Sequence, residues 1–72
     1  MTDTLALEYA IKKSGKTLKS VAEVLGISYS ALWSKMHNET EFKASEISKI
    51  SAFCCIDMES KERLFFAQKG EK

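Results

Sequence analysis

The sequence predicts an all-α protein, a single compact domain of five short helices that spans residues 1–72. Three observations favour this fold class. The chain contains no proline and only three glycines, so few residues interrupt a helix. Apolar residues recur in several segments at the spacing of a buried helix face. A chain of 72 residues is long enough for one domain with a modest core, but not for two.

The first helix is predicted over residues 5–14. Thr4 stands in the N-cap position, and Gly15 follows the last turn, where glycine is the preferred residue. One side of this helix forms a narrow inward stripe, which consists of Leu7, Ala10, Ile11 and Ser14.

The second helix is predicted over residues 18–25, with Thr17 as its cap. Gly26 ends it, because glycine adopts the left-handed backbone of a tight turn most easily. Its buried face has the spacing i, i+3, i+4, i+7 and consists of Leu18, Val21, Ala22 and Leu25.

The third helix is predicted within the stretch "SYSALWSKMHN", residues 28–38. Ser28 caps it, and Ile27, directly before the cap, helps to set the angle at which the chain enters the helix. Leu32 and Met36 face the core, and Asn38 ends the helix. This orientation leaves two large aromatic side chains on the outward face.

The two remaining helices are predicted over residues 45–53 and 58–67. The loop "ETEF" before the fourth helix anchors Phe42 in the core. Lys43 stands where a capping serine or threonine would precede Glu46, so the capping box is incomplete. We leave open whether Lys43 meets a phosphate or an acidic partner. The fourth helix buries Ile47, Ile50 and part of Phe53.

The fifth helix is capped by Asp57 and carries three apolar residues near its end, which are Leu64, Phe65 and Phe66. Phe65 and Phe66 are adjacent, so one helix face cannot bury both. One is expected in the core, and the other either covers the first helix or mediates self-association. We expect order over about residues 4–67 and a frayed tail, "QKGEK".

Several classes of function are disfavoured by composition. Cys54 and Cys55 are adjacent, without Cys-x-x-Cys spacing, and His37 is the only histidine, so we expect no metal site and no cofactor. No set of nucleophile, base and orienting carboxylate is present, so we do not expect an enzyme. No apolar run is long enough to cross a membrane, and "MTDTLALEYA" lacks the basic start of a signal peptide. We therefore expect a protein of the cytosol.

The segment "LKSVAEVLGISYSALWSKM" has the pattern of a helix-turn-helix, formed by the second and third helices. Ala22 is small where the two helices cross, and Gly26 lets the chain turn without strain. Val21 and Leu32 meet in the angle between the helices.

Residues 7–66 resemble the Cro/C1-type helix-turn-helix family of temperate phages, and most of all its small five-helix members in phages of Gram-positive bacteria. The resemblance rests on "VAEVLGIS", "LWSKMHN", Phe42 followed by Glu46 and Ile47, and the closing "RLFF". It implies a regulator of a phage genetic switch in the cytoplasm of a bacterial host. It also implies that the third helix is a recognition helix, which enters the major groove of DNA.

Transferred to this chain, the resemblance assigns base-facing positions to Ser28, Tyr29, Ser30, Trp33 and Ser34. It assigns possible phosphate contacts, or contacts at the rim of a protein interface, to Lys16, Lys19, Lys35 and Lys43.

The outward residues of the third helix depart from the chemistry of base recognition. Bases are read chiefly by arginine, lysine, asparagine and glutamine, and none of the five positions carries such a side chain. The net charge is only +1, and the chain lacks the high isoelectric point that is typical of nucleic-acid binders. Tyr29 and Trp33, four residues apart, instead form one aromatic patch that Met36 or His37 can extend at its edge.

Two functions follow as hypotheses. In the first, the chain is an anti-repressor that presents this helix to the DNA-binding domain of the cognate phage repressor and blocks operator binding. In the second, it is a Cro-like dimer that binds operator DNA directly. The two are compatible if operator DNA is bound weakly or only within a joint complex. Three simpler readings stay open: Trp33 lies in the core of a rotated helix, Tyr29 is an ordinary surface residue, or His37 is a solvated helix-end histidine.

Overall fold

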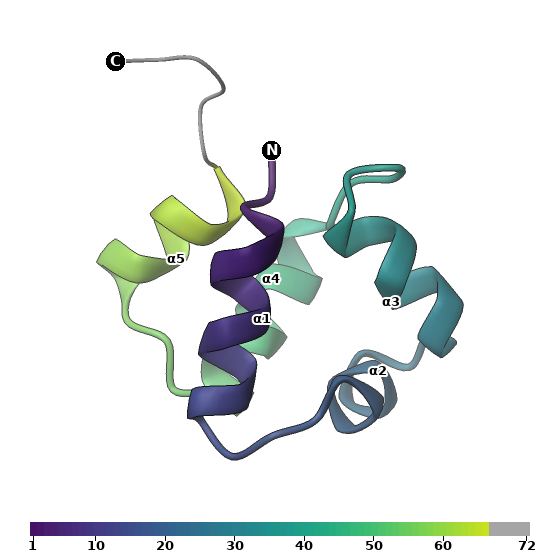
Figure 1. The fold of residues 1–72 in the computed structure, drawn as a ribbon, viewed down its shortest axis with the longest axis horizontal. Coiled ribbons are helices and arrows are strands. Elements are labelled where there is room, and N and C mark those ends of the chain that lie inside the picture. Colours follow the sequence, from purple (N-terminus) through teal and green to yellow (C-terminus); the bar gives the residue numbers. More distant parts are fainter. Residues whose placement is uncertain (67–72) are drawn as a thin grey trace.

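A computed structural model describes residues 1–66, and these residues form five α-helices and no β-strand (Figure 1). In chain order the helices are α1 (Thr4–Lys13), α2 (Leu18–Leu25), α3 (Tyr29–Met36), α4 (Ala44–Phe53) and α5 (Met58–Phe65). The prediction of an all-α, five-helix chain is confirmed. The predicted tail and Ala67, the predicted last residue of the fifth helix, lie outside the described residues.

The boundaries of α2 and α3 follow the capping residues in the sequence. The Thr17 hydroxyl oxygen accepts a hydrogen bond from the Ser20 backbone N–H at 3.0 Å, and the Ser20 hydroxyl oxygen accepts one from the Thr17 N–H at 3.0 Å. Ser28 caps α3 in the same way, because its hydroxyl oxygen accepts a hydrogen bond from the Ala31 N–H. Gly26 lies between the two helices with a φ of +73°, the left-handed conformation that its sequence position predicts.

Helix α1 begins one residue earlier than predicted because Asp3, not Thr4, is its N-cap. The Asp3 carboxylate accepts a hydrogen bond from the Ala6 N–H at 3.2 Å. The Thr4 hydroxyl is occupied elsewhere, since it donates to the carbonyl oxygen of Met36 at the end of α3. The expectation that Thr4 caps α1 is therefore wrong, because a tertiary contact takes its side chain.

Three other helix ends differ slightly from the prediction. Helix α1 ends at Lys13, with Ser14 as its C-cap. Helix α4 begins at Ala44, directly after Lys43. Helix α5 ends at Phe65, because Phe66 leaves the helical conformation with a φ of −127° and a ψ of +31°.

The core gathers apolar residues from all five helices. Its buried members are Leu7, Ile11, Val21, Ala22, Leu25, Leu32, Met36, Ile47, Ile50, Cys54, Leu64 and Phe65. Phe42 from the loop before α4 packs against this cluster, with its ring edge-to-face to Phe65 at a centroid distance of 5.3 Å. The expected role of Phe42 as an anchor is confirmed. Phe65 is the buried member of the adjacent pair, whereas Phe66 is 57% exposed.

The helices divide into two neighbouring groups around α4. In Figure 1, α1 lies in front of α4 with α5 on one side, and α2 and α3 lie on the other side. Helix α2 contacts both α3 and α4, while α5 contacts both α1 and α4. Helix α4 therefore joins the two groups through α2 and α5, and α3 packs chiefly against α2. None of the described helices is long and apolar enough to cross a membrane.

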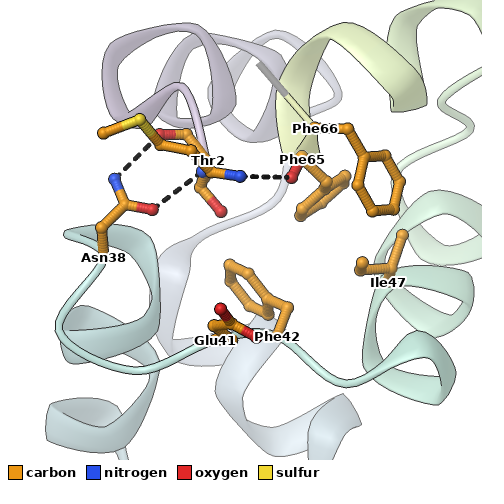
Figure 2. Close-up of a pocket in the computed structure, with 8 residues that line it drawn as sticks. Thr2, Asn38, Glu41, Phe42, Ile47, Phe65 and Phe66 are labelled. Atoms are coloured by element: carbon orange, nitrogen blue, oxygen red, sulfur yellow. Dashed lines mark hydrogen bonds between the residues drawn. The ribbon is translucent and has the colours of Figure 1, made fainter. Parts of the chain in front are cut away.

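The N-terminal segment connects the end of α3 to the end of α5. Asn38 follows α3 in the left-handed conformation, and its side-chain amide pairs with the Thr2 backbone (Figure 2). The Thr2 N–H donates to Asn38 Oδ1 at 2.8 Å, and Asn38 Nδ2 donates to the Thr2 carbonyl oxygen at 3.0 Å. The Asp3 N–H donates to the carbonyl oxygen of Leu64 at 2.7 Å. These bonds close the fold at the end where α3 stops.

Candidate functional site

Helix α3 is oriented by two buried side chains. Leu32 is 0% exposed and Met36 is 1% exposed, so the face that carries them is turned into the core. Tyr29 and Trp33 lie on the outward face, and their side chains are 52% and 44% exposed. The alternative in which Trp33 belongs to the core of a rotated helix is therefore wrong. Residues spaced i, i+4 lie on neighbouring turns of one helix face, so both aromatic side chains belong to the same surface.

His37 extends this aromatic surface beyond the last turn of α3. Its imidazole ring stacks on the indole ring of Trp33, with a centroid distance of 3.8 Å and an angle of 19° between the planes. His37 Nδ1 lies 2.9 Å from the carbonyl oxygen of Trp33, and since a carbonyl oxygen only accepts, Nδ1 is the donor. His37 is thus held by two contacts with one residue. We call Tyr29, Trp33 and His37 the aromatic patch.

Three serines, namely Ser28, Ser30 and Ser34, accompany the aromatic patch. Ser28 and Ser30 are exposed, with their hydroxyl oxygens 3.4 Å apart, and Ser34 is half-buried. A serine hydroxyl pairs with either kind of base and discriminates little between them. Their short side chains also leave the aromatic rings as the largest features of this face.

Lys35 does not project as a free positive charge, although it lies on α3. Its ammonium group forms an ion pair with Glu46 Oε1 at 3.1 Å and donates to the carbonyl oxygen of Glu41 at 3.1 Å. Only 13% of the Lys35 side chain and 11% of the Glu46 side chain are exposed. The expectation that Lys35 contacts a phosphate or the rim of an interface is a poor fit to this geometry, because its charge is already balanced inside the molecule.

Glu46 links this ion pair to the start of α4. Besides pairing with Lys35, Glu46 Oε1 accepts a hydrogen bond from the Lys43 backbone N–H at 2.9 Å. Partial burial raises the pKa of Glu46, but the hydrogen bond from Lys43 and the hydrogen bond and charge of Lys35 lower it more, so the net pKa is lower than usual. The sequence reasoning missed this role of Glu46. The signal was a lysine in the last turn of one helix and a glutamate in the first turn of the next.

The other three lysines lie on elements that flank α3. Lys19 and Lys43 are exposed, and neither forms an ion pair with another residue in the range 1–66. Lys16 is half-buried, with its ammonium nitrogen 5.0 Å from the centre of the Phe53 ring. Lys16 and Lys19 belong to the start of α2 and the loop before it, and Lys43 precedes α4. None of them belongs to α3, which carries the aromatic patch.

Comparisons of this chain with protein-family models, with curated proteins and with solved structures found no match.

Proposed function

We propose that this chain is an anti-repressor in a temperate-phage genetic switch, similar to the modulator-of-repression proteins of lactococcal phages. In this proposal α2, the turn at Gly26 and α3 form a Cro/C1-type helix-turn-helix. The outward face of α3 docks on the DNA-binding domain of the cognate phage repressor in the bacterial cytoplasm. The repressor is then unable to contact operator DNA.

A single observation carries this proposal. The outward face of α3 exposes Tyr29 and Trp33, with His37 stacked on the tryptophan, and the only lysine of the helix is held in an ion pair with Glu46. DNA recognition needs the opposite arrangement, with long donors on the outward face and positive charge beside them.

The aromatic patch has the chemistry of a protein-binding hot spot. Tryptophan and tyrosine dominate the energetics of protein interfaces, because they bury a large apolar area and still offer a polar group. The stack with His37 restricts the indole ring before any partner arrives, which lowers the entropy cost of binding. The flanking serines are small and polar, as expected for the surroundings of a hot spot.

Calorimetric titration with the repressor tests the proposed docking face. The purified chain is titrated with the repressor encoded beside it, and the Trp33→Ala variant is compared with wild type. We expect Trp33→Ala to weaken binding by about 2 kcal/mol or more, which is roughly thirtyfold in the dissociation constant. Met58→Ala is the matched control, because Met58 is 72% exposed but lies on α5. Equal affinities for Trp33→Ala and wild type would exclude this docking face.

A titration with operator DNA distinguishes the proposal from a Cro-like function. The same preparation is titrated with DNA that carries the operator of the cognate repressor, at two salt concentrations. We expect weak binding at most. Tight, sequence-specific binding that falls steeply with salt would instead identify direct operator recognition, with phosphate contacts from residues such as Lys19 and Lys43.

A further inference from the structure

A pocket of about 470 Å³ lies where the loop after α3 meets the end of α5 (Figure 2). Three phenyl rings line it, those of Phe42, Phe65 and Phe66, together with the aliphatic side chain of Ile47. Figure 2 shows Phe65 and Phe66 on one side of the pocket, with Phe42 and Glu41 on the other. A cavity of this size is large enough to hold a long side chain of a partner.

The pocket combines this aromatic lining with one unpaired carboxylate. Glu41 is exposed, and its carboxylate forms no ion pair with another residue in the range 1–66. The other charged group among the lining residues is the Met1 ammonium, which points at the carbonyl oxygen of Phe65 at 3.5 Å. The Glu41 carboxylate is therefore the charged side chain that a ligand would meet.

The charges around the pocket do not reverse this sign. The Lys35 ammonium approaches the backbone carbonyl oxygen of Glu41, but it is paired with Glu46. Glu39 and Lys43 are exposed on the same loop, and neither lines the pocket. Because two carboxylates stand against one ammonium on this loop, its surroundings favour a cationic ligand.

Phenyl rings beside a carboxylate form a site with the chemistry to recognise arginine. A guanidinium is planar, so it can stack on a phenyl ring and donate two parallel hydrogen bonds to a carboxylate. A neutral apolar side chain would also fill the space, but it would remove water from Glu41 without replacing the hydrogen bonds. The carboxylate would repel an anionic group.

We propose that this pocket, which we call the arginine pocket, binds an arginine side chain of the repressor that docks on α3. Asn38 lines the pocket and directly follows His37, so the pocket continues the surface of the aromatic patch. The inference rests on the function proposed above. Arginine makes the commonest specific contact to guanine in the major groove, so the operator-binding face of a repressor is expected to carry it. An arginine held in the pocket is withdrawn from base recognition.

Calorimetric titration of the repressor with two pocket variants tests the site. Glu41→Gln keeps the size of the side chain and removes its charge, so we expect the dissociation constant to rise at least about tenfold. Phe66→Ala removes an exposed ring of the pocket, and we expect a rise of at least about threefold. The matched controls are Glu59→Gln and Met58→Ala, which change exposed residues at the opposite end of α5 and should bind like wild type. Circular dichroism verifies that all four variants fold.

A double-mutant cycle identifies the occupant of the pocket. Each arginine in the DNA-binding domain of the repressor is replaced by alanine in turn, and each repressor variant is titrated with wild type and with Glu41→Gln. At the arginine that enters the pocket, we expect the combined loss to be much smaller than the sum of the two single losses, because both changes break one contact. At the other arginines the losses should add.

The arginine pocket can fail while the proposed function stands. Equal affinities for Glu41→Gln and Glu59→Gln would overturn the pocket, and so would losses that add at every arginine of the repressor. In either case, a persistent loss for Trp33→Ala would keep the docking face on α3. If the repressor did not bind the wild-type chain, both proposals would be wrong.

Discussion

At the scale of single residues, the stack of His37 on Trp33 shapes the outward surface of α3. His37 is the C-cap of α3, and its ring reaches back over the indole while Nδ1 donates to the carbonyl oxygen of Trp33. The ring therefore contributes area to the aromatic patch and also limits the rotation of Trp33.

Two replacements of His37 test whether a stacked ring is needed to order the Trp33 indole and whether that ring must be an imidazole. His37→Ala removes the stacked ring, so we expect the indole to become mobile and its near-ultraviolet circular dichroism to decrease. Trp33 is the only tryptophan, so the indole signal is specific to it. His37→Phe is the matched control and should retain most of the signal, since a phenyl ring also stacks on indole. An unchanged spectrum for His37→Ala would show that the stack does not order the indole.

At the scale of secondary-structure elements, the Lys35–Glu46 ion pair joins two helices. Lys35 belongs to the last turn of α3 and Glu46 to the first turn of α4. Among the described residues, no second ion pair within 4.0 Å links these two helices or involves the loop between them. The ion pair thus adds a polar link between the end of α3 and the start of α4 to the packing of Leu32 and Met36 in the core.

Removal of the Glu46 charge should make the stability less sensitive to acid. Because folding lowers the pKa of Glu46, its contribution is complete above the pKa of the unfolded chain, about 4.3, and is lost as pH falls through the lower folded value. We expect Glu46→Gln to lower the free energy of unfolding at pH 7 by about 1.5 kcal/mol, and the gap from wild type to close in acid. Urea unfolding across pH measures this.

Glu59→Gln provides the control for this experiment. Glu59 also pairs with a cation, Arg63, but at 3.8 Å and with 83% of its side chain exposed. Exposed ion pairs contribute little to stability, so we expect the unfolding curve to match that of wild type at every pH. If both variants behaved alike, the Lys35–Glu46 pair would have no special part in stability.

At the scale of the whole molecule, α5 completes the hydrophobic core. The two adjacent phenylalanines at its end contribute to that core very unequally. Phe65 is 3% exposed and contacts Phe42 edge-to-face, whereas Phe66 is 57% exposed. A chain of 72 residues has a small core, so one aromatic side chain is a large fraction of it.

Replacing Phe65 or Phe66 with alanine should therefore change the stability of the fold to very different extents. We expect Phe65→Ala to lower the free energy of unfolding by about 3–5 kcal/mol, and Phe66→Ala to change it by no more than about 0.5 kcal/mol. Urea unfolding measures both, and Phe65→Leu provides a milder change if Phe65→Ala does not fold. Similar losses at the two positions would contradict the assignment of Phe65 to the core.

Local signals in the sequence were sufficient for most of the helices. Thr17, Ser28 and Asp57 cap α2, α3 and α5 as predicted, because a cap hydrogen bond joins residues that are close in sequence. The inward residues of α3 were also predicted, since helical spacing alone puts Leu32 and Met36 on one face. The exposure of Tyr29 and Trp33 follows from the same spacing.

The errors arose where residues distant in sequence meet. Thr4 was predicted to cap α1, but its hydroxyl donates to Met36 on α3. Lys35 was counted among the free cations, but its charge is balanced by Glu46 on α4. The contact of Thr4 with Met36 has no local signature in the sequence. Lys35 and Glu46 lie at facing ends of successive helices, but whether their charges meet depends on how α3 and α4 pack.

The sequence by itself determined that the chain is helical, where α2 and α3 begin, and which aromatic residues face outward, because those properties depend on neighbours within one or two helical turns. Only the tertiary structure decided that Phe65 rather than Phe66 is buried, that Lys35 is neutralised, and that His37 stacks on Trp33. Burial, ion pairing and side-chain stacking are set by the positions of atoms in three dimensions. A helical pattern narrows those positions but does not specify them.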